Sequence, residues 1–107
     1  MLIYVASRYG KDSDSFKRAI KVTHDLQTKD LANCYVSPVL TFSHLDCREI
    51  CCDDEIELRL DLLSIADRLI IADKVSEGIK TEVTFAKLVK MEVMRLDENG
   101  ELRPFTE

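Results

Sequence analysis

The sequence has no tryptophan, and its 107 residues include only 3 glycines and 2 prolines. Few residues are therefore available for sharp turns, and we expect short connections between regular elements. No stretch approaches the ~20 consecutive apolar residues of a membrane span. The apolar run near the start has no basic residue ahead of it, so we expect neither a membrane helix nor a secretory signal. These absences favour a cytoplasmic protein.

Acidic residues outnumber basic ones, with 20 Asp and Glu against 15 Lys and Arg and a formal net charge of -5. A general affinity for nucleic-acid polymers needs a basic surface, so we do not expect one here. A single small nucleotide remains possible, because a few local donors are enough to hold one phosphate. The composition, 46% hydrophobic and 33% charged, is typical of a globular chain, and the length predicts one domain over residues 1–107.

The cysteines are candidate metal ligands that cluster in the sequence. They are Cys34, Cys47, Cys51 and Cys52, with His44 nearby. Their spacing matches no standard zinc ribbon or finger, and adjacent cysteines on a helix point in different directions. We therefore predict reduced thiols, no metal site and no other cofactor.

The hydrophobic pattern alternates between strand and helix. Strands are predicted at 2–7, 33–40, 68–73, 92–96 and 102–105, and helices at 13–30, 53–67 and 76–91, with a loop from 41 to about 52. The apolar residues of the first helix recur near a period of 3.6 residues: Phe16, Ala19, Ile20, Val22 and Leu26. This order predicts an α/β fold, with a parallel sheet of four to five strands and helices on both faces. Asn99-Gly100 is a hairpin signal, so the last strand is expected to fold back antiparallel.

In such a sheet the ligand site lies beyond the carboxyl ends of the strands. The predicted ends are followed by "ASRYG", "SPVLTFSHLD" and "ADKVSEG", which we expect to line one crevice. In the first of these, Ser7 offers a hydroxyl, Arg8 a fixed cation and Gly10 a close backbone approach, a combination suited to phosphate. The alternative is a polar turn with a surface arginine.

Two acidic groups on the predicted helices are candidates for chemistry. Glu57 and Asp61 share one helix face, from which Arg59 points away, and the leucines around Asp61 predict that its carboxylate is partly buried. The alternative is a solvated acidic face.

The second group is Ser76, Gly78 and Glu82 at the start of the last predicted helix. Ser76 is expected to be the N-cap, and Glu82 to lie on the face that Gly78 leaves open for a ligand. The alternative is an ordinary surface glutamate near Lys80 and Lys87.

Three segments together resemble a known family: "IYVASRYG", "RLDLLSIADRLIIAD" and "SEGIKTEVTFAK". They are similar to the nucleoside 2-deoxyribosyltransferase-like superfamily, which includes 2'-deoxynucleoside 5'-monophosphate N-glycosidases and small phage and bacterial members. The resemblance covers about residues 1–90. Its most specific parts are Asp61 and Asp67 before a strand, and the Ser-x-Gly-x3-Glu motif that ends at Glu82.

The resemblance implies a flavodoxin-like or Rossmann-like sheet, a homodimer or larger assembly, and cleavage or transfer of an N-glycosidic bond in a (deoxy)nucleoside or nucleoside 5'-monophosphate. Glu82 matches the carboxylate that attacks or stabilises the anomeric carbon. Asp61 matches the acid that handles sugar hydroxyls or protonates the departing base. The residues implied to bind substrate are Tyr4, Ser7, Arg8, Tyr9, Gly10, Ser76 and Gly78.

Two other functions remain open from the residues alone. The same crevice would also suit a protein that binds a nucleotide or a nucleotide-derived signal without cleaving it. The third possibility is an oligomeric scaffold with a vestigial site, which a filled or inaccessible crevice would indicate. For self-association, the apolar helix face of Leu58, Leu62 and Ile65 is the candidate surface.

Overall fold

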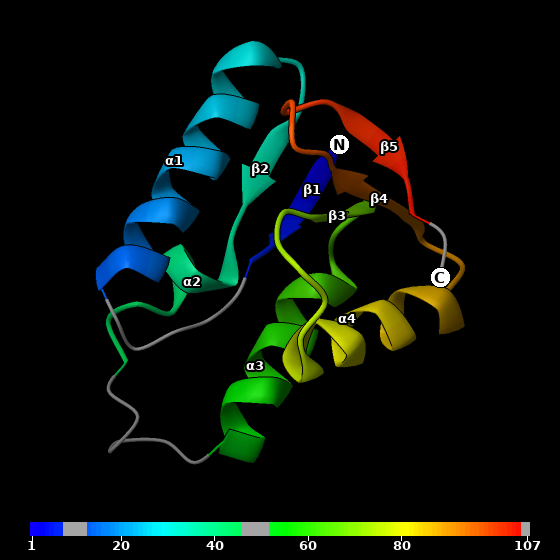
Figure 1. Cartoon of the computed structure of the whole chain (residues 1–107). Helices are drawn as coiled ribbons and strands as arrows, with labels where there is room; N and C mark the ends of the chain where they lie inside the picture. The colour runs from blue at the N-terminus through cyan, green and yellow to red at the C-terminus, as the bar shows by residue number, and fades with distance from the viewer. Residues whose placement is uncertain (8–12, 46–51, 106–107) are drawn as a thin grey trace.

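The computed structural model describes residues 1–7, 13–45 and 52–105, which form five strands and four helices (Figure 1). In chain order they are β1 (Leu2–Ala6), α1 (Ser13–Lys29), β2 (Cys34–Val36), α2 (Pro38–Thr41), α3 (Cys52–Ser64), β3 (Arg68–Ile71), α4 (Glu77–Leu88), β4 (Glu92–Leu96) and β5 (Leu102–Pro104). None of the helices in these ranges is long and apolar enough to cross a membrane.

The strands form one mixed sheet in the order β2-β1-β3-β4-β5. β1 pairs in parallel with both β2 and β3, and β3 pairs in parallel with β4. Only β5 runs antiparallel to its neighbour, after a turn in which Gly100 has a φ of +80°. The predicted α/β class, the parallel sheet and the antiparallel last strand are confirmed, and the strand order is that of flavodoxin-like folds.

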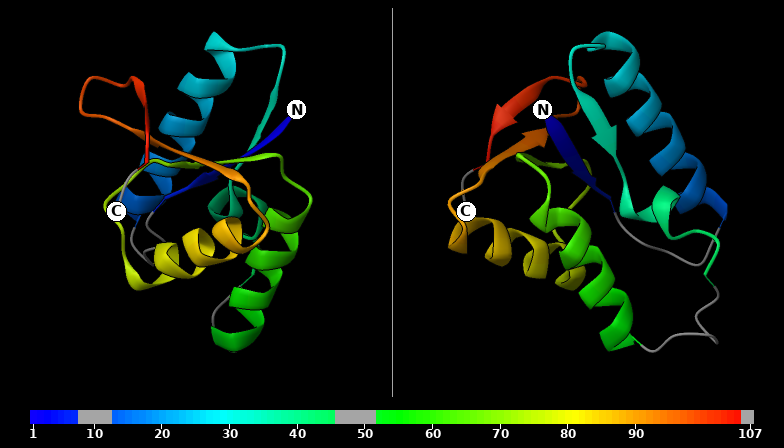
Figure 2. Two further views of the ribbon diagram at one scale, coloured as in Figure 1. Left: turned by 90° about the vertical axis from the view of Figure 1, so that its right-hand side faces the viewer. Right: turned by 180° about the vertical axis from the view of Figure 1, so that it is seen from behind.

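Helices cover both faces of the sheet, with α1 on one side and α3 and α4 on the other (Figure 2). Side chains alternate along β1, so Tyr4 and Ala6 join the core beneath α3 and α4, together with Leu63, Ile79 and Val83. Ile3 and Val5 are equally buried on the opposite face. The first connection leaves β1 toward β2, and the next strand returns to the other side of β1. The topological switch therefore lies between β1 and β3.

The amino ends of β1 and β3 are joined by two reciprocal hydrogen bonds. The Leu2 amide donates to Oδ2 of Asp67 at 2.8 Å, and the Asp67 amide donates to the Leu2 carbonyl at 2.7 Å. At the other end, the Ala72 amide donates to the Ala6 carbonyl at 2.8 Å. A one-residue slip would turn Tyr4 away from α4, so these contacts fix which side chains reach the site.

Two details differ from the expectation. Pro38 does end β2, but it also begins the short helix α2 in what was predicted as strand and loop, since proline suits the first helical position. On α1, the buried stripe consists of the small residues Ser15, Ala19 and Thr23, whereas Phe16 and Ile20 are exposed. Small side chains let α1 lie close to the sheet, and the larger apolar ones flank the contact.

Candidate functional site

The site is built on the first turns of α4, where a serine fixes the start of the helix. Ser76 has an extended backbone (φ −100°, ψ 177°), and its hydroxyl accepts a hydrogen bond from the Ile79 amide at 3.4 Å. The Ser76 carbonyl accepts the Lys80 amide at 2.9 Å. The predicted N-cap is thereby confirmed, and it sets the rotation of the helix that carries Glu82.

Glu82 points inward, with only 2% of the residue exposed. Its Oε1 accepts a hydrogen bond from Nη2 of Arg59 at 3.2 Å. Its Oε2 has no hydrogen-bond partner in the described part of the chain. The interpretation of Glu82 as a surface glutamate is therefore wrong. A buried carboxylate oxygen without a partner is unusual, because such a group loses its hydration and receives nothing in exchange.

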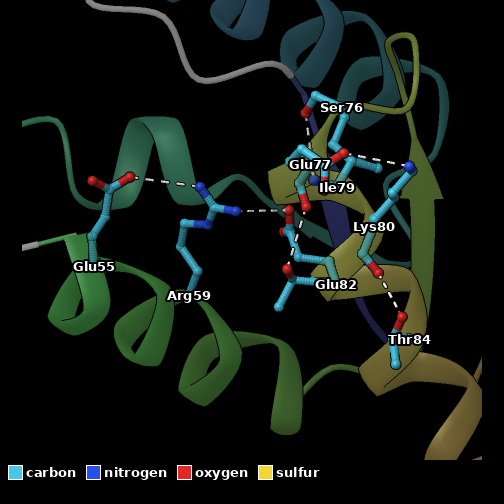
Figure 3. Close-up of polar contacts among 9 residues, drawn as sticks. Glu55, Arg59, Ser76, Glu77, Ile79, Lys80, Glu82 and Thr84 are labelled. Carbon is cyan, nitrogen blue, oxygen red and sulfur yellow. Dashed lines mark hydrogen bonds and ion pairs between the residues drawn. The ribbon is translucent and has the colours of Figure 1, made fainter.

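Arg59 is the residue that fills the space beside Gly78. Figure 3 shows its guanidinium between Glu55 and Glu82, reaching from α3 across to α4. A Cβ atom at Gly78 would lie 2.9 Å from Nη2 of Arg59. The expectation that Gly78 leaves an opening for a ligand is therefore wrong in this structure, since the opening holds an arginine of the same chain.

Tyr4 lies beneath this ion pair on β1 and is fully buried. Burial, and then the nearby Glu82 carboxylate, raise the pKa of the Tyr4 phenol far above its ordinary value, so Tyr4 stays neutral. Its hydroxyl nevertheless makes no hydrogen bond of normal geometry within the described residues. Tyr4 and Glu82 therefore interact electrostatically, without a hydrogen bond of normal geometry between them.

Opposing effects act on the protonation of Glu82. Burial raises the pKa of the Glu82 carboxyl, whereas the Tyr4 hydroxyl and the positive charge of Arg59 lower it. Burial has the largest effect, so the net pKa lies above the ordinary range of glutamate. Arg59 is consequently the charged group that favours the ionised form of Glu82.

Further polar groups lie at the carboxyl ends of the strands. Ser7 follows β1 and Ser37 follows β2, and both are buried with hydroxyls that lack a partner in the ranges the structure covers. Asp73, which follows β3, accepts a hydrogen bond from Nη1 of Arg18 at 2.9 Å. Ser7 therefore lies at the predicted edge of the sheet. Arg8, Tyr9 and Gly10 lie outside the described residues.

Asp61 does not reach this site. It lies in the last turn of α3 and is exposed, as is Glu57 on the same face. The predicted partial burial of Asp61 is wrong, because the leucines that flank it turn toward the core while Asp61 turns to solvent. Asp61 makes no ion pair or hydrogen bond with Glu82. The two carboxylates proposed to act together therefore do not converge.

A hollow of about 370 Å³ lies at the carboxyl ends of β3 and β4. Its lining includes the apolar Ile71 and Phe105 and the cations Lys74 and Arg95. Its volume is in the range of small-molecule sites. Glu82 does not line it, so a ligand held there alone would not reach the carboxylate.

The described residues contain no group of three or more His, Cys, Asp or Glu side chains arranged to hold a metal ion. Cys34 is an exposed free cysteine, and His44 is exposed. Cys47 and Cys51 lie outside the ranges that are described. No metal role follows for the two residues that can be seen.

Comparison with known proteins adds no family to this geometry. No protein-family model matches the chain, and no curated protein matches it significantly. The resemblance to the nucleoside 2-deoxyribosyltransferase-like superfamily therefore rests on the sequence motifs alone, and the roles it implies remain predictions.

Proposed function

We propose that the protein cleaves or transfers the N-glycosidic bond of a (deoxy)nucleoside or nucleoside 5'-monophosphate, with Glu82 as the carboxylate at the anomeric carbon. The observation that carries this proposal is the state of the Glu82 carboxylate: one oxygen is held by Arg59, and the other is buried without a partner in the described chain. A fixed, dehydrated carboxylate of this kind suits, in its ionised form, a reaction that develops positive charge on a sugar.

In the hydrolytic form of the step, the bond between C1' and the base nitrogen breaks and its electron pair leaves with the base. The base takes a proton from water, and the remaining hydroxide oxygen bonds to C1'. Oε2 of Glu82 stabilises the positive charge on C1', or forms a sugar ester that water then opens. In the transfer form, a second base replaces water. The step requires Glu82 to be ionised, as the neighbouring Arg59 favours.

Substrate contacts are assigned to the carboxyl edge of the sheet. Ser7 and Ser37 present buried hydroxyls there without partners among the described residues, and they are suited to sugar hydroxyls or phosphate oxygens. The family resemblance adds Arg8 and Gly10 for the 5'-phosphate, and Tyr9 for the sugar or base. Ser76 and Gly78 are assigned a different part, since their contacts within the chain set the position of Glu82.

The resemblance also implies a homodimer or larger assembly, and the sequence favours a cytoplasmic location. We include both in the proposal. Of the apolar side chains predicted for its interface, Ile65 is 66% exposed, while Leu58 and Leu62 are half-buried. Sedimentation velocity over a range of protein concentrations tests this assembly. An Ile65→Glu variant that stays folded is expected to sediment as a monomer.

A second candidate function is nucleotide binding without turnover. The position of Asp61 favours it, because an exposed carboxylate in the last turn of α3 cannot protonate a base held beside Glu82. The burial of Glu82 also favours it, since substrate must open a path to a residue that is 2% exposed. In this case the protein would bind the nucleotide at the same edge and release it unchanged.

The experiment is to incubate the purified protein with deoxynucleosides and their 5'-monophosphates and to measure released base by chromatography. We expect release by the wild type, and its loss in Glu82→Gln, which keeps the shape of the side chain and removes its charge. Glu77→Gln is the matched control, because Glu77 lies on the same helix with a 93% exposed side chain. Asp61→Asn is expected to retain activity.

Absence of released base, together with a ligand-dependent rise in Tm, would exclude the enzymatic function and favour nucleotide binding without turnover. Equal activity in the wild type and in Glu82→Gln would exclude Glu82 as the reacting carboxylate. Loss of activity in Asp61→Asn would indicate that Asp61 takes part in the reaction and would contradict the geometry described above.

A further inference from the structure

Arg59 is a charged residue that the helical pattern of α3 does not require, yet its side chain is only 11% exposed. We infer that Arg59 is a positioning residue for Glu82: it fixes Oε1 and leaves Oε2 as the reacting atom. This inference rests on the proposed function, since it assigns Arg59 a part in the same reaction. Its geometric part, the control of Glu82 by Arg59, is testable by itself.

The guanidinium is anchored on both sides. Nη1 lies 3.5 Å from Oε1 of Glu55, one turn earlier on α3, and Nη2 donates to Oε1 of Glu82 at 3.2 Å on α4 (Figure 3). A planar guanidinium with two such partners has one preferred orientation. Glu55 therefore aims Arg59, and Arg59 holds one oxygen of Glu82.

Gly78 makes this arrangement possible. Any Cβ at this position would come within 2.9 Å of Nη2 and 3.6 Å of Nη1. Gly78 and Glu82 are one turn apart on α4, so the bare backbone and the carboxylate border the same space. In the Ser-x-Gly-x3-Glu motif, the serine thus caps the helix, the glycine leaves space for Arg59, and the glutamate carboxylate accepts a hydrogen bond from Arg59.

The charges around Glu82 define what Arg59 contributes. Tyr4 faces Glu82 from β1, Arg59 faces it from α3, and Glu55 lies behind Arg59. Arginine does not lose its proton in proteins, so its effect is present at every working pH. Arg59 favours ionised Glu82 against the effect of burial, and Glu55 competes for the same guanidinium.

Two substitutions should therefore move the acid limb of kcat/KM in opposite directions. Arg59→Met removes the cation, so the acid limb of the pH profile of kcat/KM should move to higher pH. The value of kcat should fall about 10- to 100-fold, which is the rate equivalent of one charge-assisted hydrogen bond. KM should change little. Glu55→Gln keeps a side-chain oxygen that can accept a hydrogen bond from Nη1 of Arg59 but removes the competing negative charge, so the limb should move to lower pH. Arg59→Lys keeps the charge without the planar fork, so the limb should stay near that of the wild type while kcat falls.

A measurement independent of activity keeps the two proposals apart. In a ¹³C NMR titration of the Glu82 side-chain carboxyl, the midpoint should rise in Arg59→Met and fall in Glu55→Gln. Midpoints unchanged in both variants would overturn the assignment of Arg59, whether or not base is released. Midpoints that move in a protein without base release would instead overturn the proposed function, and with it the catalytic part of Arg59. If Arg59→Met does not fold, the Glu55→Gln titration decides.

Discussion

Replacement of Gly78 by alanine should destabilise the protein, although alanine is the better helix former. The new Cβ would lie 2.9 Å from Nη2 of Arg59, closer than side chains pack. The backbone of α4 is fixed by the Ser76 cap, so the guanidinium is the part that must move. Nη2 is the end of a flexible side chain, so it can shift by a few tenths of an ångström, and this shift weakens its 3.2 Å contact with Glu82.

The magnitude follows from two opposing contributions. Alanine in place of glycine stabilises a helix interior by up to about 1 kcal/mol, and by less in the first turn. A hydrogen bond to a charged group contributes about 1.5–3 kcal/mol, and Glu82, with its side chain 3% exposed, cannot find water in exchange. The guanidinium keeps part of this contact when it shifts, so the net loss is about 1 kcal/mol, which lowers Tm by about 4 °C or more in a domain of this size.

Thermal unfolding of Gly78→Ala in the wild-type and Arg59→Ala backgrounds tests this reasoning. Without the arginine side chain nothing opposes the new methyl group, so the same substitution should become stabilising. The sign of its effect on Tm should therefore differ between the two backgrounds. A rise in Tm in both backgrounds would refute the close fit between Gly78 and Arg59, since helix propensity alone would then account for the result.

Two further predictions concern the same helix. Ser76→Ala removes the N-cap hydroxyl and should lower the free energy of unfolding, measured by urea titration, by about 1 kcal/mol. Ser76→Gly should lower it by only a few tenths of a kcal/mol. Equal losses in the two variants would mean that the hydroxyl does not cap α4. Because the pKa of Glu82 is raised in the folded state, the folded protein holds the proton of the Glu82 carboxyl more tightly than the unfolded chain does. The wild-type free energy of unfolding should therefore fall as pH rises from about 4.3, the ordinary pKa of glutamate, through the raised pKa of Glu82. Glu82→Gln lacks this titration, so its Tm relative to wild type should increase between about pH 4 and pH 7, and a constant difference would contradict the raised pKa.

Most of the fold could be predicted because its elements have strong local signals. The buried strands are short β-branched runs, the helices have regular apolar spacing, and Asn99-Gly100 gives the hairpin. α2 was missed because a four-residue helix has no periodicity to detect. The exposure of Phe16 and Ile20 was missed because helix spacing identifies apolar residues on a face but not which of them the sheet covers.

The site was predicted in part. Ser76 and Glu82 were found because a cap and a carboxylate at fixed spacing are local features. Arg59 was missed because its partner is 23 residues away on another helix, a distance over which the sequence carries no contact information. The available signal was the glycine at Gly78, which indicates a close neighbour but does not identify it. Asp61 was misplaced because leucines next to a residue in a helix say little about the direction of that residue.

The paired hydrogen bonds between Leu2 and Asp67 have a consequence for the order in which the protein folds. β1 is the first strand to be synthesised and lies inside the sheet, yet its second neighbour, β3, ends only at Ile71. A nascent chain can pair β1 with β2 early, but one edge of β1 stays open until β3 has emerged. That edge presents unpaired N–H and C=O groups on a strand with apolar side chains, so the period before β3 arrives is when the chain is most exposed to aggregation. A substitution that removes the Asp67 carboxylate should therefore lower the yield of folded protein more than it lowers the stability of the protein that has folded.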